Sequence, residues 1–253
     1  MIRHSRLTRR AFSTGLLAAA SLGYCPCCSA QGAGGKGGLF EGEKVLCAAA
    51  AGGVPTEEAL LNTSGDGNLD RILAAEMIQQ SQFFGMRPAF MLYTGPNQNA
   101  LATSRTVLAG TQGTILYNLA FLQSQLKSGE WGGAIVAGVL AHEFSHIYQF
   151  YSPYGQRLEA LHKTVKFPEL HADYISAFYM AKKYVADKVK LDSYFDEFYR
   201  LGDYDFNQKD HHGTREERYF AVKSGHNLSL MNKDKGIAFA AAQGEALLKE
   251  YFR

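Results

Sequence analysis

The residues best suited to chemistry are His142, Glu143 and His146, which form an H-E-x-x-H pattern. Residues four apart in a helix lie on one face, so the two histidines can direct ring nitrogens at one point. Zinc accepts imidazole ligands in this arrangement, and Glu143 projects beside the metal, where its carboxylate can take a proton from a metal-bound water. The pattern predicts two zinc ligands and a general base. The alternative is two hydrogen-bonded core histidines and an ion-paired glutamate.

A catalytic zinc site needs a third protein ligand and keeps one position open for water. A metzincin would have glycine and histidine further along the same run, but the sequence has Gln149 and Ser152 there, which excludes that class. Glu169 is the better candidate. It follows Pro168, which suits the first turn of a second apolar helix.

Asp173 lies four residues after Glu169 and shares its helix face. The glutamate can therefore bind the metal while the aspartate accepts the outer N–H of a ligating histidine and fixes its tautomer. Asp173 could instead be the ligand, as in aspzincins, with Glu169 on the surface. His171 points away from the face of Glu169, and His162 is isolated and more typical of a surface residue.

Together these residues resemble the gluzincin metallopeptidases, and more narrowly an exported, soluble relative of the HtpX-like and CAAX-prenyl-protease-related family. In that family H-E-x-x-H is followed by E-x-x-A-D or E-x-x-x-D. The matching residues are His142, Glu143, His146, Glu169, Ala172 and Asp173. The resemblance implies a zincin-like fold and one Zn²⁺ per chain, with Glu169 as the third ligand. It also implies that Asn99 and Ala100 belong to a strand that lies along the substrate cleft.

A later stretch contains His212 and Arg218. Thr214 and Glu217 between them form a capping-box pattern, which predicts a helix that starts there and ends near Gly225. By resemblance to the corresponding run of neutral zinc metallopeptidases, His212 would donate a hydrogen bond to the oxyanion, and Arg218 would hold the loop or the substrate. The alternative is a solvated, charged loop and helix cap.

The elements that must position these residues predict an α+β fold. The motif lies in an apolar helix that runs from about residue 134 to 151, and residues 68–84 and 237–251 have helical spacing. Residues 87–93, 99–103 and 105–109 predict strands, and residues 114–126 predict a helix. Short helices are expected within residues 42–53 and from Thr56. We therefore expect a small, mostly antiparallel sheet packed on the active-site helix, with a predominantly helical C-terminal half.

Residues 1–30 resemble a twin-arginine export signal, with Arg9 and Arg10 ahead of a short apolar run and a cleavage site after Ala30. The protein is then periplasmic or secreted. Residues 31–55 are expected to be a flexible leader, and residues 56–253 a single metallopeptidase domain. The mature chain has no apolar run long enough for a transmembrane anchor.

Removal of the signal leaves 22 basic against 24 acidic residues, and no basic patch supports nucleic-acid binding. Cys47 would remain alone, without a disulfide partner. A retained Cys25 to Cys28 cluster, serving metal or redox chemistry, is the weaker alternative, and so is a lipid anchor at Cys25.

The sequence thus predicts an exported zinc-dependent endopeptidase that acts on a peptide or protein substrate. Zinc activates the water, and Glu143 is the general base. The alternative function is a non-catalytic, zinc-stabilised periplasmic binding or chaperone-like protein.

Overall fold

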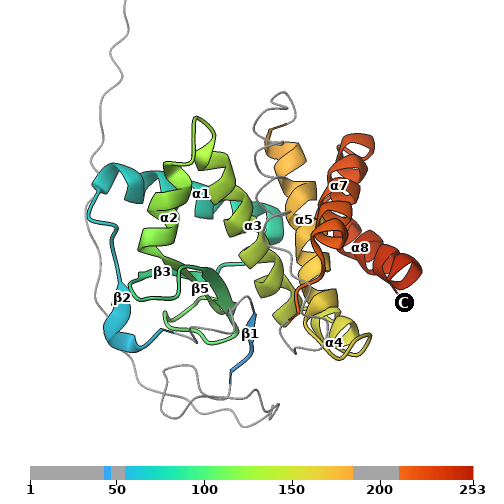
Figure 1. Cartoon of the computed structure of the whole chain (residues 1–253), viewed down its shortest axis with the longest axis horizontal. Helices are drawn as coiled ribbons and strands as arrows, with labels where there is room; N and C mark the ends of the chain where they lie inside the picture. The colour runs from blue at the N-terminus through green and yellow to red at the C-terminus, as the bar shows by residue number, and fades with distance from the viewer. Residues whose placement is uncertain (1–42, 47–54, 185–210, 253) are drawn as a thin grey trace, which may run out of the picture.

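The computed structural model describes residues 43–46, 55–184 and 211–252, and these form an α+β fold with a mixed sheet and a mostly helical C-terminal half (Figure 1). The expected fold class is confirmed at this level. The predicted signal at residues 1–30, most of the leader and all four cysteines lie outside the described residues. Within the described part of the chain, every helix is too short or too polar to cross a membrane.

The sheet has five strands in the order β1-β4-β5-β3-β2. The strands are β1 (Val45–Leu46), β2 (Leu60–Leu61), β3 (Ala89–Tyr93), β4 (Ala100–Thr103) and β5 (Thr114–Asn118). Strands β3 and β5 run parallel, and the other three pairings are antiparallel, so the expected antiparallel character holds for most of the sheet. The strands expected at 87–93 and 99–103 are confirmed as β3 and β4.

The helix expected over residues 114–126 is wrong in its first five residues, which form β5. All five are buried, and their β-branched and aromatic side chains suit a strand covered on both faces. The helix begins only after Asn118, whose side chain accepts a hydrogen bond from the backbone N–H of Phe121 at 3.0 Å and caps α2 (Leu119–Leu126).

Two other expected elements differ. Residues 105–109 form no strand, and Leu108 is 50% exposed in a loop that Gly113, with a φ of +70°, turns into β5. Val45 and Leu46 form β1 instead of part of a helix, because they pair with Thr103 and Ala102 of β4. After Thr56 the chain makes a short 3-10 helix, η1 (Glu57–Ala59).

Helix α3 (Gly132–Phe150) carries the motif and is the central element of the fold. Strands β4 and β5 and helices α1 (Gly67–Phe84) and α2 pack on one side of it, and α5 (Lys166–Lys183) packs on the other (Figure 1). Helices α1 and α5 were expected at these positions. Gly85 ends α1 with a φ of +65°, as predicted. Almost the whole surface of α3 is therefore covered.

The helices α4 (Tyr154–Glu159), α5, α7 (Arg215–Met231) and α8 (Ile237–Tyr251) make up the C-terminal half. The predicted end of a helix near Gly225 is wrong, since α7 continues to Met231. Gly225 instead lets α7 approach α5, because a Cβ atom there would lie 2.0 Å from the backbone oxygen of Tyr174. The glycine serves close helix packing and does not end the helix.

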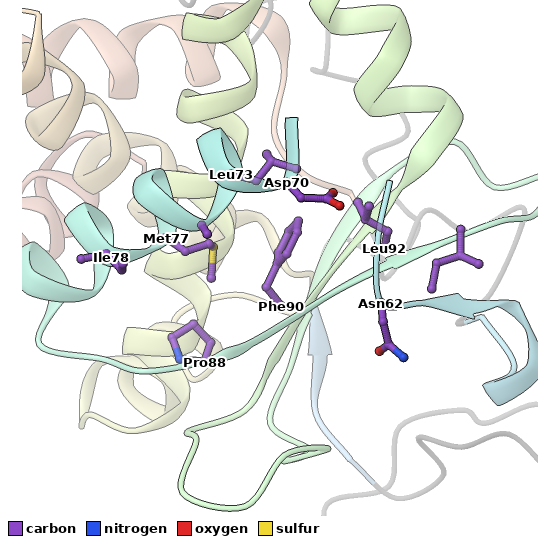
Figure 2. Close-up of a pocket in the computed structure, with 10 residues that line it drawn as sticks. Asn62, Asp70, Leu73, Met77, Ile78, Pro88, Phe90 and Leu92 are labelled. Carbon is purple, nitrogen blue, oxygen red and sulfur yellow. The ribbon is translucent and has the colours of Figure 1, made fainter. Parts of the chain in front are cut away.

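A groove of about 350 Å³ lies between α1 and β3, away from the motif residues (Figure 2). Leu73 and Met77 of α1 and Phe90 and Leu92 of β3 supply much of its apolar lining, with Asp70 among its polar residues.

Candidate metal centre

His142 and His146 lie one turn apart on α3 and point their Nε2 atoms toward one another, 3.0 Å apart. Their rings are nearly perpendicular, at 89°, and the side chains are almost fully buried. The placement follows from the four-residue spacing, because the same face of a covered helix must carry both rings.

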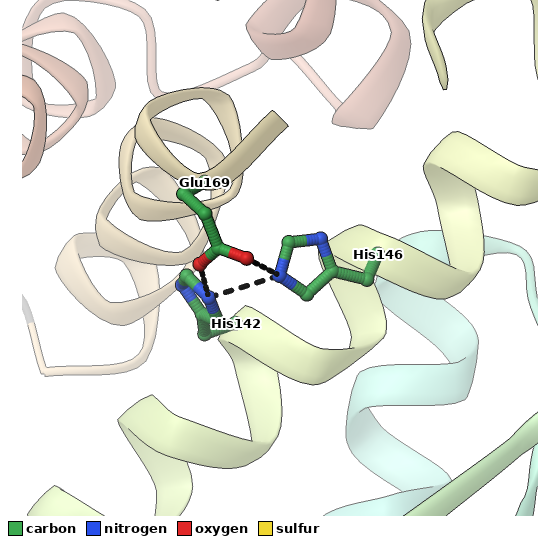
Figure 3. Close-up of side chains that lie close together, drawn as sticks. All are labelled: His142, His146 and Glu169. Atoms are coloured by element: carbon green, nitrogen blue, oxygen red, sulfur yellow. Dashed lines mark hydrogen bonds and ion pairs between the residues drawn. The ribbon is translucent and has the colours of Figure 1, made fainter. Parts of the chain in front are cut away.

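Glu169 reaches the two histidines from the first turn of α5 (Figure 3). Its Oε2 lies 3.1 Å from Nε2 of His142, and its Oε1 lies 3.5 Å from Nε2 of His146. A tetrahedral site with bonds of about 2.0–2.1 Å separates its ligand atoms by about 3.4 Å. The three observed separations are close to this spacing, so the group could hold a metal ion.

The charges at this group suit a cation. Burial raises the pKa of the Glu169 carboxyl, but the charges of His146 and His212 and the hydrogen bond with His142 hold it well below its usual range. Burial lowers the pKa of His142, but hydrogen bonds to Asp173 and Glu169 outweigh burial and raise it to about 9. The site therefore stabilises positive charge between two ionised carboxylates.

Asp173 contacts the opposite ring nitrogen of His142 and does not join the metal group. Its Oδ1 lies 2.9 Å from Nδ1 of His142. Arg218 of α7 holds the same carboxylate in a two-point contact, with Nε 2.8 Å from Oδ2 and Nη2 2.7 Å from Oδ1. Burial raises the pKa of Asp173, but the Arg218 charge outweighs it and lowers the pKa. Asp173 thus links a candidate ligand to a buried arginine.

The other rival ligands lie apart from the three candidate ligands. His171 is buried and turned toward Gln149 and the carbonyl of Ala241. Burial lowers the pKa of His171 to about 4, which the hydrogen bond to Ala241 opposes only in part. His162 is exposed and stacks on Phe167.

Glu143 is buried beside His142, with 2% of its surface exposed. Burial raises the pKa of Tyr93 to about 12, and the Glu143 charge adds to the rise. The Tyr93 hydroxyl lies 2.9 Å from the carbonyl oxygen of Asn99. Tyr93 therefore ties the segment that leads into β4 to a hydroxyl whose pKa Glu143 helps to raise.

Asn99 and Ala100 lie at the start of β4, where Ala100 is fully buried and pairs with Tyr117 of β5. The backbone carbonyl of Asn99 also accepts a hydrogen bond from the Asn118 N–H at 2.9 Å. Strand β4 is not an edge strand along its whole length, because β1 covers its last two residues.

His212 comes close to the metal group from the loop before α7. Its Nε2 lies 4.0 Å from Oε1 of Glu169, and 21% of its side chain is exposed. The predicted capping box of Thr214 and Glu217 is present, and it fixes the start of α7 next to His212. Arg218 is 3% exposed, and its guanidinium group holds the Asp173 carboxylate.

Sequence reasoning missed the role of Gln149, which is buried between α3 and α5 and contacts both His146 and His171. Its only signal is an amide in an otherwise apolar part of the motif helix, three residues after the second histidine.

A comparison with protein-family models finds no match, and comparisons with curated proteins and with solved structures find no significant similarity.

Proposed function

We propose that the protein is a zinc-dependent endopeptidase in which His142, His146 and Glu169 hold one Zn²⁺. The observation that carries this proposal is the convergence of two imidazole nitrogens and a buried carboxylate at ligand spacing. Two nitrogen ligands and one oxygen ligand, with a fourth position left for water, are typical of catalytic zinc. The zincin-like class of the fold and the gluzincin relationship are part of the same proposal.

The proposal gives each residue a role that its position supports. When bound, zinc supplies a Lewis acid that polarises the scissile carbonyl and lowers the pKa of its water. Glu143 takes a proton from the attacking water and returns it to the leaving amine. Asp173, held by Arg218, accepts the Nδ1–H of His142 and keeps its Nε2 directed at the metal. His212, beside Glu169 and partly exposed, donates a hydrogen bond to the developing oxyanion.

The substrate in this proposal is a peptide or an unfolded protein segment. Asn99, whose carbonyl oxygen accepts from the Tyr93 hydroxyl, and Ala100 would lie along the bound backbone. The arginine-rich start of the chain supports export to the periplasm or the medium.

The burial of the candidate ligands and of Glu143 favours a second function. The three candidate ligands are 0–3% exposed and Glu143 is 2% exposed, as in a closed structural zinc site. In this alternative, zinc stabilises a non-catalytic periplasmic binding or chaperone-like protein.

The two functions are separated by cleavage of unfolded casein with the zinc-loaded chain and with Glu143→Gln at equal zinc content. We expect the variant to lose at least about 100-fold in rate, because it lacks the general base. Glu130→Gln, at an exposed position, is the control and should cleave like the wild type. Equal cleavage by wild type and Glu143→Gln would exclude the proposed mechanism, and no cleavage by either would favour the structural site.

The ligand assignment is tested by zinc content. Glu169→Ala should lose tightly bound zinc, because it removes one of three protein ligands, whereas Glu143→Gln should keep it. A Glu169→Ala variant with the wild-type zinc content would overturn the assignment.

A further inference from the structure

Gln149 is the centre of a buried hydrogen-bond network beside the metal group. It is 1% exposed, and its side-chain amide meets three partners. Its Oε1 lies 2.9 Å from Nδ1 of His146, while its Nε2 lies 2.8 Å from the Pro168 carbonyl oxygen and 3.1 Å from Nδ1 of His171. The network therefore joins α3 to the residue that immediately precedes Glu169.

The orientation of the amide follows from the chemistry of these partners. The Pro168 carbonyl can only accept a hydrogen bond, so the NH₂ group of Gln149 must face it. A flipped amide would press two oxygens together. The amide oxygen therefore faces His146, and His146 must donate through Nδ1–H. Its Nε2 is then left with a lone pair that faces His142 and Glu169.

The proton position of His171, on the other side of Gln149, follows from the same reasoning. His171 places Nε2 2.9 Å from the carbonyl oxygen of Ala241 in α8, which also only accepts. His171 therefore donates through Nε2–H, and its Nδ1 accepts the second N–H of Gln149. A Cβ atom at Gly244 would lie 2.9 Å from Cδ2 of His171, so the packing of α8 leaves this ring little room to turn.

Each donor in this network meets an acceptor in only one arrangement of protons. We propose that Gln149, anchored by Pro168 and His171, is a positioning residue that fixes His146 as the Nδ1–H tautomer and aims its Nε2 at the metal. The inference rests on the proposed zinc site. It goes beyond that site because it assigns the residue that orients His146. Asp173 has the corresponding contact with His142.

The test uses the full chain and two substitutions at the same position. Gln149→Leu keeps the volume but removes all three hydrogen bonds. Gln149→Glu keeps the acceptor for His146. Its buried carboxyl must take a proton to face the Pro168 carbonyl, so this variant keeps that donor and loses only the one for His171. Gln80→Leu is the matched control, because Gln80 is also a fully buried glutamine that donates to a carbonyl of α3, that of Ala137, at 2.9 Å.

Long-range ¹H–¹⁵N correlation spectra of the histidine rings, recorded without zinc at pH 8, report the tautomers directly. We expect the proton on Nδ1 of His146 and on Nε2 of His171 in the wild type. Gln149→Leu should lose the single His146 tautomer, whereas Gln149→Glu should retain it and change only the His171 signals. A wild-type His146 with its proton on Nε2 would overturn the proposal.

Zinc affinity, measured by competition with a chromophoric chelator, gives the second readout. Gln149→Leu should bind zinc about 10- to 100-fold more weakly, as expected for loss of a group that orients a ligand. Gln149→Glu should restore affinity to within a few-fold, and Gln80→Leu should match the wild type. Unchanged affinity in Gln149→Leu would refute the role of Gln149 alone. A wild type that binds no zinc would refute the metal site and, with it, this inference.

Discussion

The contact between Arg218 and Asp173 provides the most quantitative test of the site. Both side chains are buried, with 4% and 0% of their surfaces exposed, and they share two hydrogen bonds of 2.8 and 2.7 Å. Replacing Arg218 by Met preserves much of the side-chain volume but leaves the Asp173 carboxylate with His142 as its charged partner. Breaking a buried pair in this way costs about 3–5 kcal/mol, because a buried charge loses its compensation.

Urea unfolding of the zinc-free chain measures this cost. With a slope of about 2 kcal/mol per molar, a loss of 3–5 kcal/mol lowers the midpoint by about 1.5–2.5 M. The matched control is Arg157→Met. Arg157 forms an ion pair of 2.8 Å with Glu245, but its side chain is 48% exposed. Its loss should cost less than about 1 kcal/mol.

The double variant Arg218→Met/Asp173→Asn tests the cause, because the asparagine oxygen can still accept from Nδ1 of His142. It should be more stable than Arg218→Met, because it removes the negative charge that Arg218 compensated. The reasoning is refuted if Arg218→Met and Arg157→Met differ by less than about 1 kcal/mol. It is also refuted if the double variant is less stable than Arg218→Met.

Three further predictions concern stability. Gly225→Ala should destabilise the fold by at least about 1–3 kcal/mol, because its Cβ would meet the Tyr174 backbone. Gly133→Ala, with open space around its Cβ, should be neutral or stabilising by up to about 1 kcal/mol. Equal urea midpoints for these two variants would contradict the packing. The pKa of His171 is lowered from 6.5 to about 4, so its contribution is complete above pH 6.5 and is lost as the pH falls toward 4, up to roughly 3 kcal/mol. His171→Asn should therefore show a flatter loss of stability between pH 6.5 and 4.5, and an unchanged pH profile would speak against a neutral His171. Zinc at 100 times its dissociation constant should stabilise the chain by about 2.7 kcal/mol, and a chelator should reverse this. Thermal unfolding of Glu169→Ala should not respond to either, and a zinc-dependent rise in its midpoint would count against this ligand.

The sequence was most informative where helical spacing and residue chemistry agreed. Two histidines four apart in an apolar run, and Glu169 and Asp173 four apart after a proline, led to the correct helices and placed the side chains on the correct faces. Spacing placed each pair on one face of its own helix. The choice of Glu169 over Asp173 came from the family resemblance, and only the packing of α5 on α3 brings Glu169 to the two histidines.

The rest depended on contacts that spacing does not encode. Residues 114–118 satisfied a helical pattern, and only pairing with β3 and β4 selects the strand. Arg218 lies far along the chain from Asp173, and in the sequence its charge was equally consistent with a solvated loop. Only the packing of α7 on α5 brings Arg218 to Asp173. Gly225 was read as a helix end, because a glycine at a close helix crossing has the same sequence signal.

The burial of α3 has a consequence for how the molecule opens. Of its 19 residues, 16 are buried, and they are covered by the sheet on one side and by α5 on the other. Separation of either half would expose an apolar face of this helix to water, which makes partial opening expensive. The amides of α3 should therefore exchange with solvent hydrogen only when both halves come apart together. In this way, one helix makes the two halves a single cooperative unit.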